Sequence, residues 1–406
     1  MTGTGTGTVV RSATAEDYEV VSGRFATAMM FPFTPTDEKR AVFEPERTLV
    51  AESGGEVVGT ARALTRTLSV PGGIVPAAHV TGVGVAPTSR RRGVLSALMR
   101  RQLDEATEPV AALWASDPAI YRRYGYEYAG TGFAATVDLP RVRPLPVEDP
   151  GTLHEITAAE AADLLPPVLA EFQRTRPGVS GRGERHWTAR LADPPEARSG
   201  GTPRQLVVHR AADGRVDGYA AWRGKSGFDA AGAAAEVELE ELVAVDGAAH
   251  ESLWHHLLTM DLAVRLRYHH LSPGEPVWQR VGNPRALTAT WHDTLWLRIL
   301  DVPGALTRRR YQVPVDVVLD VTDEFTPGNS GRFRLTADAD EVHCERTDAA
   351  PDLSMRESVL AGVYLGGRGL GEFAGTGRVV EHRAGALAAT AAAFGWPVAP
   401  GPVEIF

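Results

Sequence analysis

The sequence predicts a mixed α/β protein made of three consecutive units. At 406 residues the chain exceeds one ordinary hydrophobic core, so two or three domains are expected. Strand-like and helical segments alternate over residues 9–137 and again from about 152 to 297, and residues 138–150, with four prolines in thirteen positions, separate the two runs. A third alternation begins near Leu297. We therefore predict domains over residues 1–145, 146–297 and 298–406.

Composition and charge exclude several classes of protein. The hydrophobic fraction of 43% is typical of a soluble globular chain, and no apolar run is long enough to span a bilayer. The net charge of -9 argues against a general nucleic-acid binder. Residues 1–8 lack the basic start and apolar core of a signal peptide, and the single cysteine, Cys344, fits a reducing compartment. No His, Cys or acidic cluster has metal-ligand spacing. A cytoplasmic protein without metal, nucleic-acid or membrane partners is therefore predicted.

The first unit is predicted to contain four strands and three helices. Thr14 is a suitable N-cap for the first helix, and the turn Ser53–Gly55 separates two strand-like runs. Five apolar residues share one side of a later helix, namely Val94, Leu95, Leu98, Met99 and Leu103. The expected elements are helix 17–30, strands 47–51, 57–67 and 80–85, helix 91–106, strand 110–115 and helix 118–124.

The second unit has the same alternation of strand-like and helical segments, and the third unit is smaller. Expected in the second unit are helix 157–174, strands 204–211, 216–223 and 236–245, and helix 248–264. Expected in the third are strands 315–321 and 331–336 and helices 354–360 and 384–394. The proline-rich tail, residues 397–406, ends on Phe406. Because unanchored termini are usually polar, this apolar end predicts that the tail docks onto the protein.

Residues 80–94 combine the features that bind a pyrophosphate. Strand 80–85 leads through a short loop into a helix that opens with Arg90, two further arginines and Gly93. A helix N-terminus offers unpaired N–H groups and a positive dipole end, and glycine lets the backbone approach the ligand closely. Gly82 and Gly84 inside the strand suggest a bulge. The alternative is a solvated basic surface, which the helix dipole disfavours because it repels arginine at this end.

This stretch resembles the coenzyme A signature of the GNAT acetyltransferases. The signature reads Val-x-Val-x-Pro and then Arg-x-x-Gly, which maps onto Val83–Pro87, Arg90 and Gly93. The family often has Gly or Ala where this chain has Leu95, and that departure is tolerable because the amide does the binding. The resemblance implies acetyl-CoA as co-substrate. The implied contact residues are Val83, Gly84, Val85, Arg90, Arg91, Arg92, Gly93, Val94, Leu95, Ser96, Ser116, Tyr121 and Arg122.

A second cluster follows strand 110–115. In GNAT folds this strand splays from its neighbour to admit acetyl-CoA, and a short helix with a Gly-aromatic pair follows, which Gly125 and Tyr126 match. The resemblance implies that Tyr126 is the acid that protonates the leaving thiolate, and a phenol can donate this proton while un-ionised at pH 7. The alternative is that Tyr126 is an ordinary packing residue, as we expect for the rings of Tyr121, Tyr124 and Tyr128.

The second unit lacks this signature. Asp246 and Ala249 stand where the first unit has Arg90 and Gly93, and an aspartate would repel a pyrophosphate. We therefore expect a degenerate GNAT-like domain that does not bind coenzyme A.

Taken over nearly its whole length, the chain resembles the Eis (enhanced intracellular survival) family of N-acetyltransferases. The resemblance rests on tandem GNAT-like units, residues 295–304 and 363–367, and the terminal Phe406. It implies a C-terminal domain like a sterol carrier protein, a homohexamer, and acetylation of primary amines on polycationic acceptors such as aminoglycosides. It also implies that the α-carboxylate of Phe406 is the catalytic base. Alternatively, Phe406 is only a hydrophobic plug.

The acceptor stays open at this point. A polyamine, an aminoglycoside and a protein lysine all present the same amine chemistry. A non-catalytic carrier of coenzyme A or of a lipid is the alternative from another class.

Overall fold

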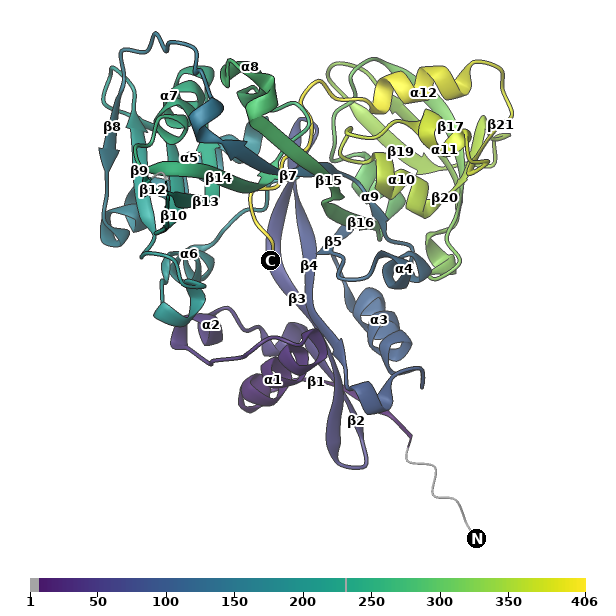
Figure 1. Ribbon diagram of the computed structural model, residues 1–406. Helices are drawn as coiled ribbons and strands as arrows, with labels where there is room; N and C mark the ends of the chain where they lie inside the picture. Colours follow the sequence, from purple (N-terminus) through teal and green to yellow (C-terminus); the bar gives the residue numbers. More distant parts are fainter. Residues whose placement is uncertain (1–6, 231) are drawn as a thin grey trace.

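The computed structural model describes residues 7–230 and 232–406. Most of residues 1–8, in which the sequence predicts no signal peptide, therefore lies outside the described residues. Three bodies surround the C-terminus in Figure 1: the first unit below in purple and blue, the second at the upper left in teal, and the third at the upper right in yellow. The expected mixed architecture of three α/β units is confirmed.

The first unit is built on a seven-stranded sheet in the order β1-β2-β3-β4-β5-β16-β6. Its strands are β1 (Val9–Ser12), β2 (Thr48–Ser53), β3 (Glu56–Val70), β4 (Gly73–Val85), β5 (Val110–Trp114), β16 (Leu295–Ile299) and β6 (Glu127–Tyr128). Its helices are α1 (Tyr18–Met29), α2 (Asp37–Ala41), α3 (Val94–Glu105) and α4 (Pro118–Tyr121). Helix α3 starts three residues later than predicted, because Gly93 has the left-handed φ of 83° at its N-cap.

The second unit also has a seven-stranded sheet, in the order β15-β7-β14-β13-β10-β9-β8. Its strands are β7 (Thr131–Asp138), β8 (Thr152–Glu155), β9 (Gln205–Arg210), β10 (Val216–Lys225), β13 (Ala235–Ala244), β14 (Ala263–Leu271) and β15 (Leu287–Asp293). Its helices are α5 (Ala158–Thr175), α6 (Glu184–Leu191), α7 (Gly247–Leu258) and α8 (Val277–Arg280). A short hairpin, β11 (Phe228–Asp229) and β12 (Gly232–Ala233), projects from it. Helix α7 ends before the predicted residue 264, and β14 follows in its place.

The two large sheets exchange strands. Strand β7 comes from the first unit's sequence but pairs with β14 and β15, and β16 comes from the end of the second unit but pairs with β5 and β6. Successive strands β6 and β7 run antiparallel to successive strands β15 and β16, so one two-stranded ribbon passes from one sheet into the other. Sheet membership therefore does not follow the boundaries predicted at 145 and 297.

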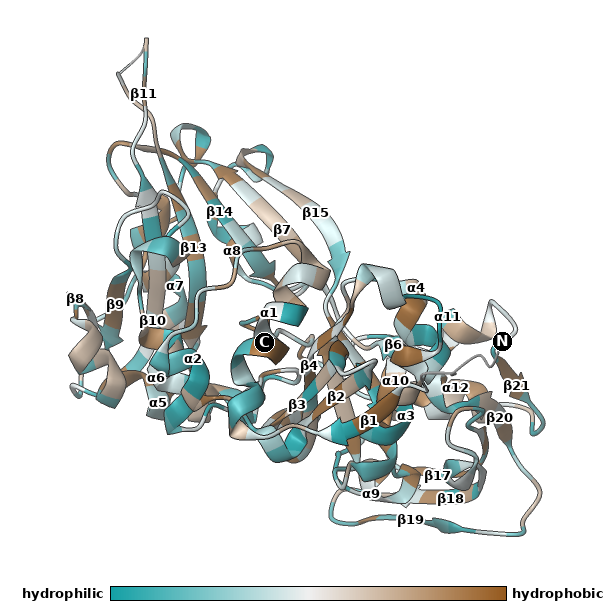
Figure 2. Ribbon diagram, turned by 90° about the horizontal axis from the view of Figure 1, so that it is seen from below, coloured by the Kyte–Doolittle hydropathy of each residue, from teal (hydrophilic) through white to brown (hydrophobic). Residues whose placement is uncertain are grey.

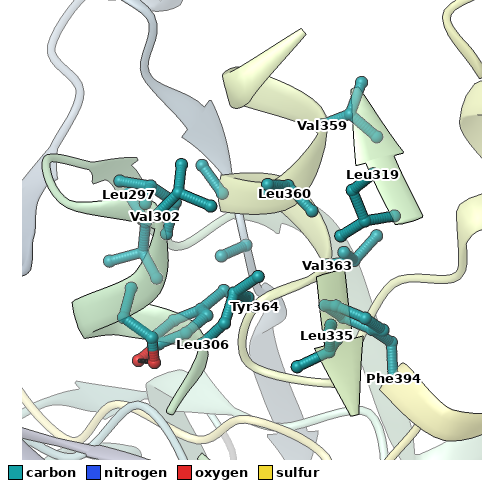
Figure 3. Packing of buried hydrophobic residues seen from close by; sticks show 14 of the residues in the cluster. Leu297, Val302, Leu306, Leu319, Leu335, Val359, Leu360, Val363, Tyr364 and Phe394 are labelled. Carbon is teal, nitrogen blue, oxygen red and sulfur yellow. Dashed lines mark hydrogen bonds between the residues drawn. The ribbon is translucent and has the colours of Figure 1, made fainter. Parts of the chain in front are cut away.

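The third unit shares its core with the first sheet. Its sheet has the order β19-β18-β17-β20-β21. The elements are α9 (Val302–Leu306), β17 (Val315–Thr322), β18 (Gly331–Ala337), β19 (Val342–Arg346), β20 (Leu353–Arg356), α10 (Glu357–Val363), α11 (Leu370–Ala374), β21 (Val379–Glu381) and α12 (Ala386–Phe394). The helix expected at 354–360 begins at Glu357, since residues 354–356 belong to β20. One buried hydrophobic cluster joins β16, α10 and β17. It includes Leu297 of β16, Leu360 of α10 and Leu319 of β17 (Figure 3).

Figure 2 shows how the hydropathy of the residues is distributed over these elements. In Figure 2 the chain end marked C is coloured hydrophobic, whereas helix α2 is mostly hydrophilic. In the part of the chain that the structure describes, no helix has the length and apolar character needed to cross a membrane.

Candidate functional site

The central feature of the first sheet is a gap between two parallel strands. Strand β4 pairs with β5 only at Ala77, Ala78 and His79, and within the described residues no partner strand is recorded on this side for residues 80–85. A cavity of about 850 Å³ lies beyond the point of separation. The splayed strands predicted from the resemblance are therefore present.

Strand β4 is bulged beside this gap. Thr60 lies opposite Gly84 and Arg62 opposite Thr81, so two residues of β4 face a single residue of β3. Gly82 has the left-handed φ of 60°, and Thr60 Oγ1 donates a hydrogen bond of 2.8 Å to its carbonyl. The bulge expected from the strand glycines is thus confirmed at Gly82, and it breaks the regular ladder next to the cavity.

We expect Gly82→Ala to destabilise the protein by about 2–3 kcal/mol, since an L-residue is strained at this φ and the new methyl group crowds a neighbour. A Cβ at position 82 would lie 2.6 Å from Cδ of Arg62. Gly214→Ala is the matched control, because Gly214 has a φ of 86° and open space around it. Urea unfolding of both variants checks this, and equal losses would show that the contact with Arg62 has no cost.

The N-terminus of α3 faces the cavity. Ala97 N donates to Gly93 O at 3.0 Å as the first bond of the helix, which leaves the amides of residues 94–96 without helical partners. Residues 94–96 all line the cavity, and so do Arg90 and Arg91. Free amides, a positive helix end and two guanidinium groups form an anion-binding arrangement.

Most of the residues predicted to contact coenzyme A lie at this cavity. The lining includes Val83, Gly84, Val85, Arg90, Arg91, Gly93, Val94, Leu95, Ser96, Ser116 and Tyr121. Arg92 and Arg122 are not among the lining residues. Arg122 donates to Glu127 Oε1 at 2.9 Å, and its contact with coenzyme A stays a prediction.

Sequence reasoning missed part of the cavity wall. The end of α1 contributes Ala28, Met29 and Met30, and this face could not be predicted from residues 80–94. Tyr124, assigned to packing, also lines the cavity, and its hydroxyl lies 3.2 Å from Ser96 Oγ. The remaining lining residues not foreseen are Ser89, Asp117, Ile120 and Arg123.

Tyr126 lies behind this wall. It is 1% exposed, and its ring packs edge-on against Tyr121, with 6.0 Å between the ring centroids. Its hydroxyl has no hydrogen-bond partner among the described residues. Burial raises the pKa of Tyr126 well above its ordinary value. The side chain is therefore a protonated phenol with an unused donor next to the splayed strands.

The C-terminal tail docks onto β4, as its apolar end predicted. Thr81 Oγ1 donates at 3.2 Å to an oxygen of the Phe406 carboxylate. The Phe406 ring lies 4.4 Å from the imidazole of His79, and the Arg66 guanidinium lies 5.8 Å from the same ring. Burial lowers the pKa of His79 to about 3, so this imidazole is neutral. The terminal carboxylate thus lies one residue from the bulge.

The C-terminal tail lines the equivalent cleft of the second sheet. Strands β13 and β14 pair in parallel only as far as Leu239 and Tyr268, and a space of about 250 Å³ follows. Asp246 Oδ1 accepts from Ala249 N at 3.0 Å and so caps α7. Residues of the tail, including Gly401 and Val403, line the same space. The Asp246 carboxylate thus pairs with an amide at the start of α7, whereas the amides at the start of α3 are free. The tail lines a space that is smaller than the cavity of the first domain.

Over residues 7–230 and 232–406, no group of three His, Cys, Asp or Glu side chains converges on a point that could hold a metal ion.

Comparison with known proteins gives the family. Models of an acetyltransferase (GNAT) domain match residues 9–129 and 178–299, and a sterol carrier protein domain model matches residues 302–401. An uncharacterised N-acetyltransferase of Streptomyces coelicolor is 41% identical over 362 residues, which cover 86% of this chain and 87% of that protein. N-acetyltransferase Eis of Mycobacterium tuberculosis is 33% identical over 354 residues, covering 84% and 80%.

A solved structure agrees along the whole chain. The crystal structure of Eis1 from Mycobacterium abscessus superposes with a TM-score of 0.84 at 31% identity and covers 98% of this chain and 100% of that one. The tandem GNAT domains and the sterol-carrier-like domain predicted from the sequence are confirmed. With this fold and these relatives, the chain is an N-acetyltransferase that belongs to the Eis family of GNAT enzymes.

Proposed function

We propose that this enzyme transfers the acetyl group of acetyl-CoA to a primary amine of a cationic acceptor of the aminoglycoside or polyamine type. GNAT acetyltransferases use acetyl-CoA generally. The observation that carries the proposal is the cavity between β4 and β5, lined by the free amides at the start of α3 and by Arg90 and Arg91.

The cavity has the chemistry that acetyl-CoA requires. Its pyrophosphate would lie on the amides of residues 94–96, where Gly93 has no side chain to obstruct it. The guanidinium groups of Arg90 and Arg91 would balance its charge. The bulged end of β4, next to Gly82, leaves strand amides and carbonyls free to pair with the pantetheine arm.

Two groups would carry the proton transfers. The carboxylate of Phe406 would accept a proton from the acceptor ammonium, either directly or through water, and the free amine would attack the thioester carbonyl carbon. When the C–S bond then breaks, Tyr126 would donate its proton to the departing sulfur. The products are an amide and the free thiol of coenzyme A.

A terminal carboxylate has a reference pKa of about 3.3–3.7, so it is a weak base at neutral pH. Its strength here would come from position and charge, since a fixed anion attracts the substrate ammonium and lowers the barrier to its deprotonation. The contact with Thr81 Oγ1 supports this fixed position.

The acceptor, assembly and location stay predictions. A protein lysine would present the same ammonium, so we retain it as the alternative acceptor. The homohexamer and the cytoplasmic location rest on the family resemblance and on composition.

The direct test is release of free thiol from acetyl-CoA with a panel of aminoglycosides, polyamines and lysine peptides. We expect turnover with the cationic small amines. Ser96→Asp should raise the KM for acetyl-CoA about tenfold or more, because a carboxylate at the start of α3 costs roughly 1–4 kcal/mol against a pyrophosphate.

Ala158→Asp, at the exposed start of α5, is the matched control and should leave this KM unchanged. Stabilisation by acetyl-CoA in a thermal melt, without thiol release for any amine of the panel, would contradict the proposal and favour a carrier of coenzyme A. Turnover with lysine peptides alone would identify the protein-lysine alternative.

A further inference from the structure

The tail reaches the reaction site across the second domain. Gly401 N donates to Pro177 O at 3.0 Å, and a Cβ on Gly401 would lie 2.7 Å from Cδ of Arg176. Val403 is buried in the core cluster formed by α5 and the second sheet. The cleft between β13 and β14, which tail residues line, thus fixes the course of the tail up to Val403.

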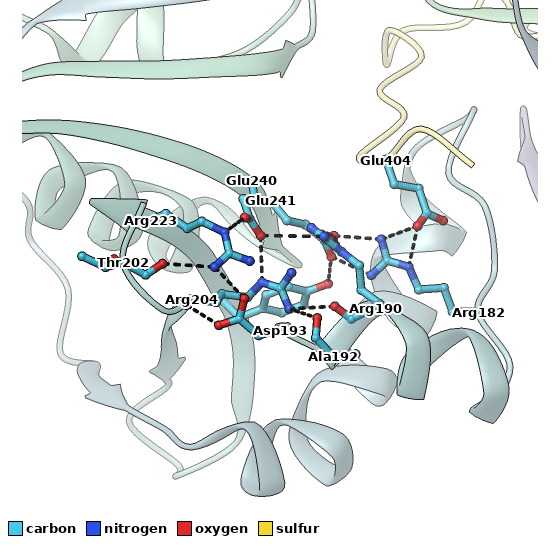
Figure 4. A network of polar contacts seen from close by, with 11 residues as sticks. Arg182, Arg190, Ala192, Asp193, Thr202, Arg204, Arg223, Glu240, Glu241 and Glu404 are labelled. Carbon is cyan, nitrogen blue, oxygen red and sulfur yellow. Dashed lines mark hydrogen bonds and ion pairs between the residues drawn. The ribbon is translucent and has the colours of Figure 1, made fainter. Parts of the chain in front are cut away.

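The next residue, Glu404, is held by two arginines from two different domains. Its Oε1 pairs with Nη2 of Arg66 on β3, and its Oε2 accepts from Arg182 at 3.0 Å from Nε and 2.9 Å from Nη2. The side chains of Arg66, Arg182 and Glu404 are 3%, 1% and 14% exposed. Figure 4 shows Arg182 between Glu404 and Glu241.

The arginine from the second domain is itself immobilised. Arg182 makes a bidentate pair with Glu241, with both N–O distances 2.8 Å, and its guanidinium lies 4.9 Å from the ring centre of Trp187. Glu241 is further held by the Tyr219 hydroxyl and by Arg190 Nε at 3.1 Å. Burial alone would raise the pKa of Glu404, but the attraction of Arg182 and Arg66 lowers it to about 2. Glu404 is therefore charged, half-buried and paired through both of its oxygens.

Glu404 and the reaction site are close in the chain. Glu404 and the Phe406 ring both lie near Arg66, whereas Ile405 between them is 65% exposed. Arg66 contacts both, through its ion pair with Glu404 and its approach to the Phe406 ring. Displacement of Glu404 would therefore displace the terminal carboxylate.

We propose that Glu404 is the positioning residue of the terminal carboxylate, and that the degenerate second domain provides the socket in which Arg182 holds it. This inference rests on the proposed function, in which that carboxylate is the base. A misplacement of about 1 Å at a reacting group can cost about 10²-fold in rate. The tail has three prolines in its last ten residues and no helix or strand, so beyond Val403 its end depends on side-chain contacts such as those of Glu404.

The test is Glu404→Gln, which keeps the shape of the side chain and removes its charge. We expect kcat to fall about 10- to 100-fold with the KM for acetyl-CoA unchanged. The rate at which a carboxypeptidase releases Phe406 should rise at least tenfold, which is a readout independent of catalysis. Glu404→Asp restores the charge on a shorter side chain. Compared with Glu404→Gln, it should raise kcat and slow the release of Phe406, each part of the way back to the wild-type value.

Asp217→Asn is the matched control. Asp217 is a buried carboxylate of the same domain, bonded to His209 Nδ1 at 2.6 Å. Its loss should lower the melting temperature while kcat and carboxypeptidase release stay as in the wild type.

Two outcomes separate the inference from the proposed function. A folded Glu404→Gln protein with normal kcat and a protected terminus would overturn the positioning role. If the terminus is released faster in this variant, but chemical blocking of the terminal carboxylate in the wild type leaves turnover intact, the positioning of the tail stands and the base role is wrong.

Discussion

Adding two residues after Phe406 is expected to lower kcat by about 10²- to 10⁴-fold, the range typical of a lost general base. The addition converts the carboxylate into a neutral peptide carbonyl. That carbonyl can still accept from Thr81 Oγ1, so the tail can stay docked, but it can neither take up a proton nor attract an ammonium. Thiol release at saturating acetyl-CoA and acceptor measures the effect.

The control for this change is the same dipeptide added before Met1, at the opposite terminus. Both proteins should be stabilised equally by acetyl-CoA, because the cavity between β4 and β5 does not include the tail. Wild-type turnover by the C-terminally extended enzyme would show that the carboxylate of Phe406 is not the base.

Tyr126→Phe is expected to lower kcat about 10²-fold or more while leaving the protein as stable or up to about 1 kcal/mol more stable. The rate falls because the departing thiolate loses its proton donor. Stability does not fall because the Tyr126 hydroxyl is buried with no hydrogen-bond partner among the described residues, so its removal also removes a desolvation cost. Thiol release and urea unfolding check the two effects.

Tyr311→Phe is the matched control in the third unit. The Tyr311 hydroxyl donates to Leu306 O at 3.0 Å, so its loss should cost about 1 kcal/mol of stability with no change in kcat. A Tyr126→Phe enzyme of normal kcat would return Tyr126 to the role of a packing residue.

The pH profile gives an independent check on Tyr126. Burial disfavours the phenolate and raises the pKa of Tyr126, so the phenol stays protonated throughout pH 6–9. No alkaline loss of kcat should therefore arise from this group in that range. An inflection near pH 9 that Tyr126→Phe abolishes would contradict the assignment.

The sequence by itself determined the chemistry of the cavity. Residues 80–96 lie in one continuous strand, loop and helix, so the bulge at Gly82, the turn at Gly93 and the free amides of α3 follow from local backbone preferences. The cap at the start of α7 was equally local, because Asp246 accepts a hydrogen bond from Ala249 N within the same turn. The docking of the tail could be predicted from its apolar end.

Only the tertiary structure decided which distant residues meet. The exchange of β7 and β16 between the sheets depends on pairing across more than 120 residues, for which an isolated strand pattern holds no information. The wall formed by α1 and the pairing of Glu404 with Arg66 and Arg182 are of the same kind. The sequence shows a charged residue two positions from the terminus. Only the fold shows that it lies between Arg66 of the first domain and Arg182 of the second, where partial burial strengthens the ion pairs.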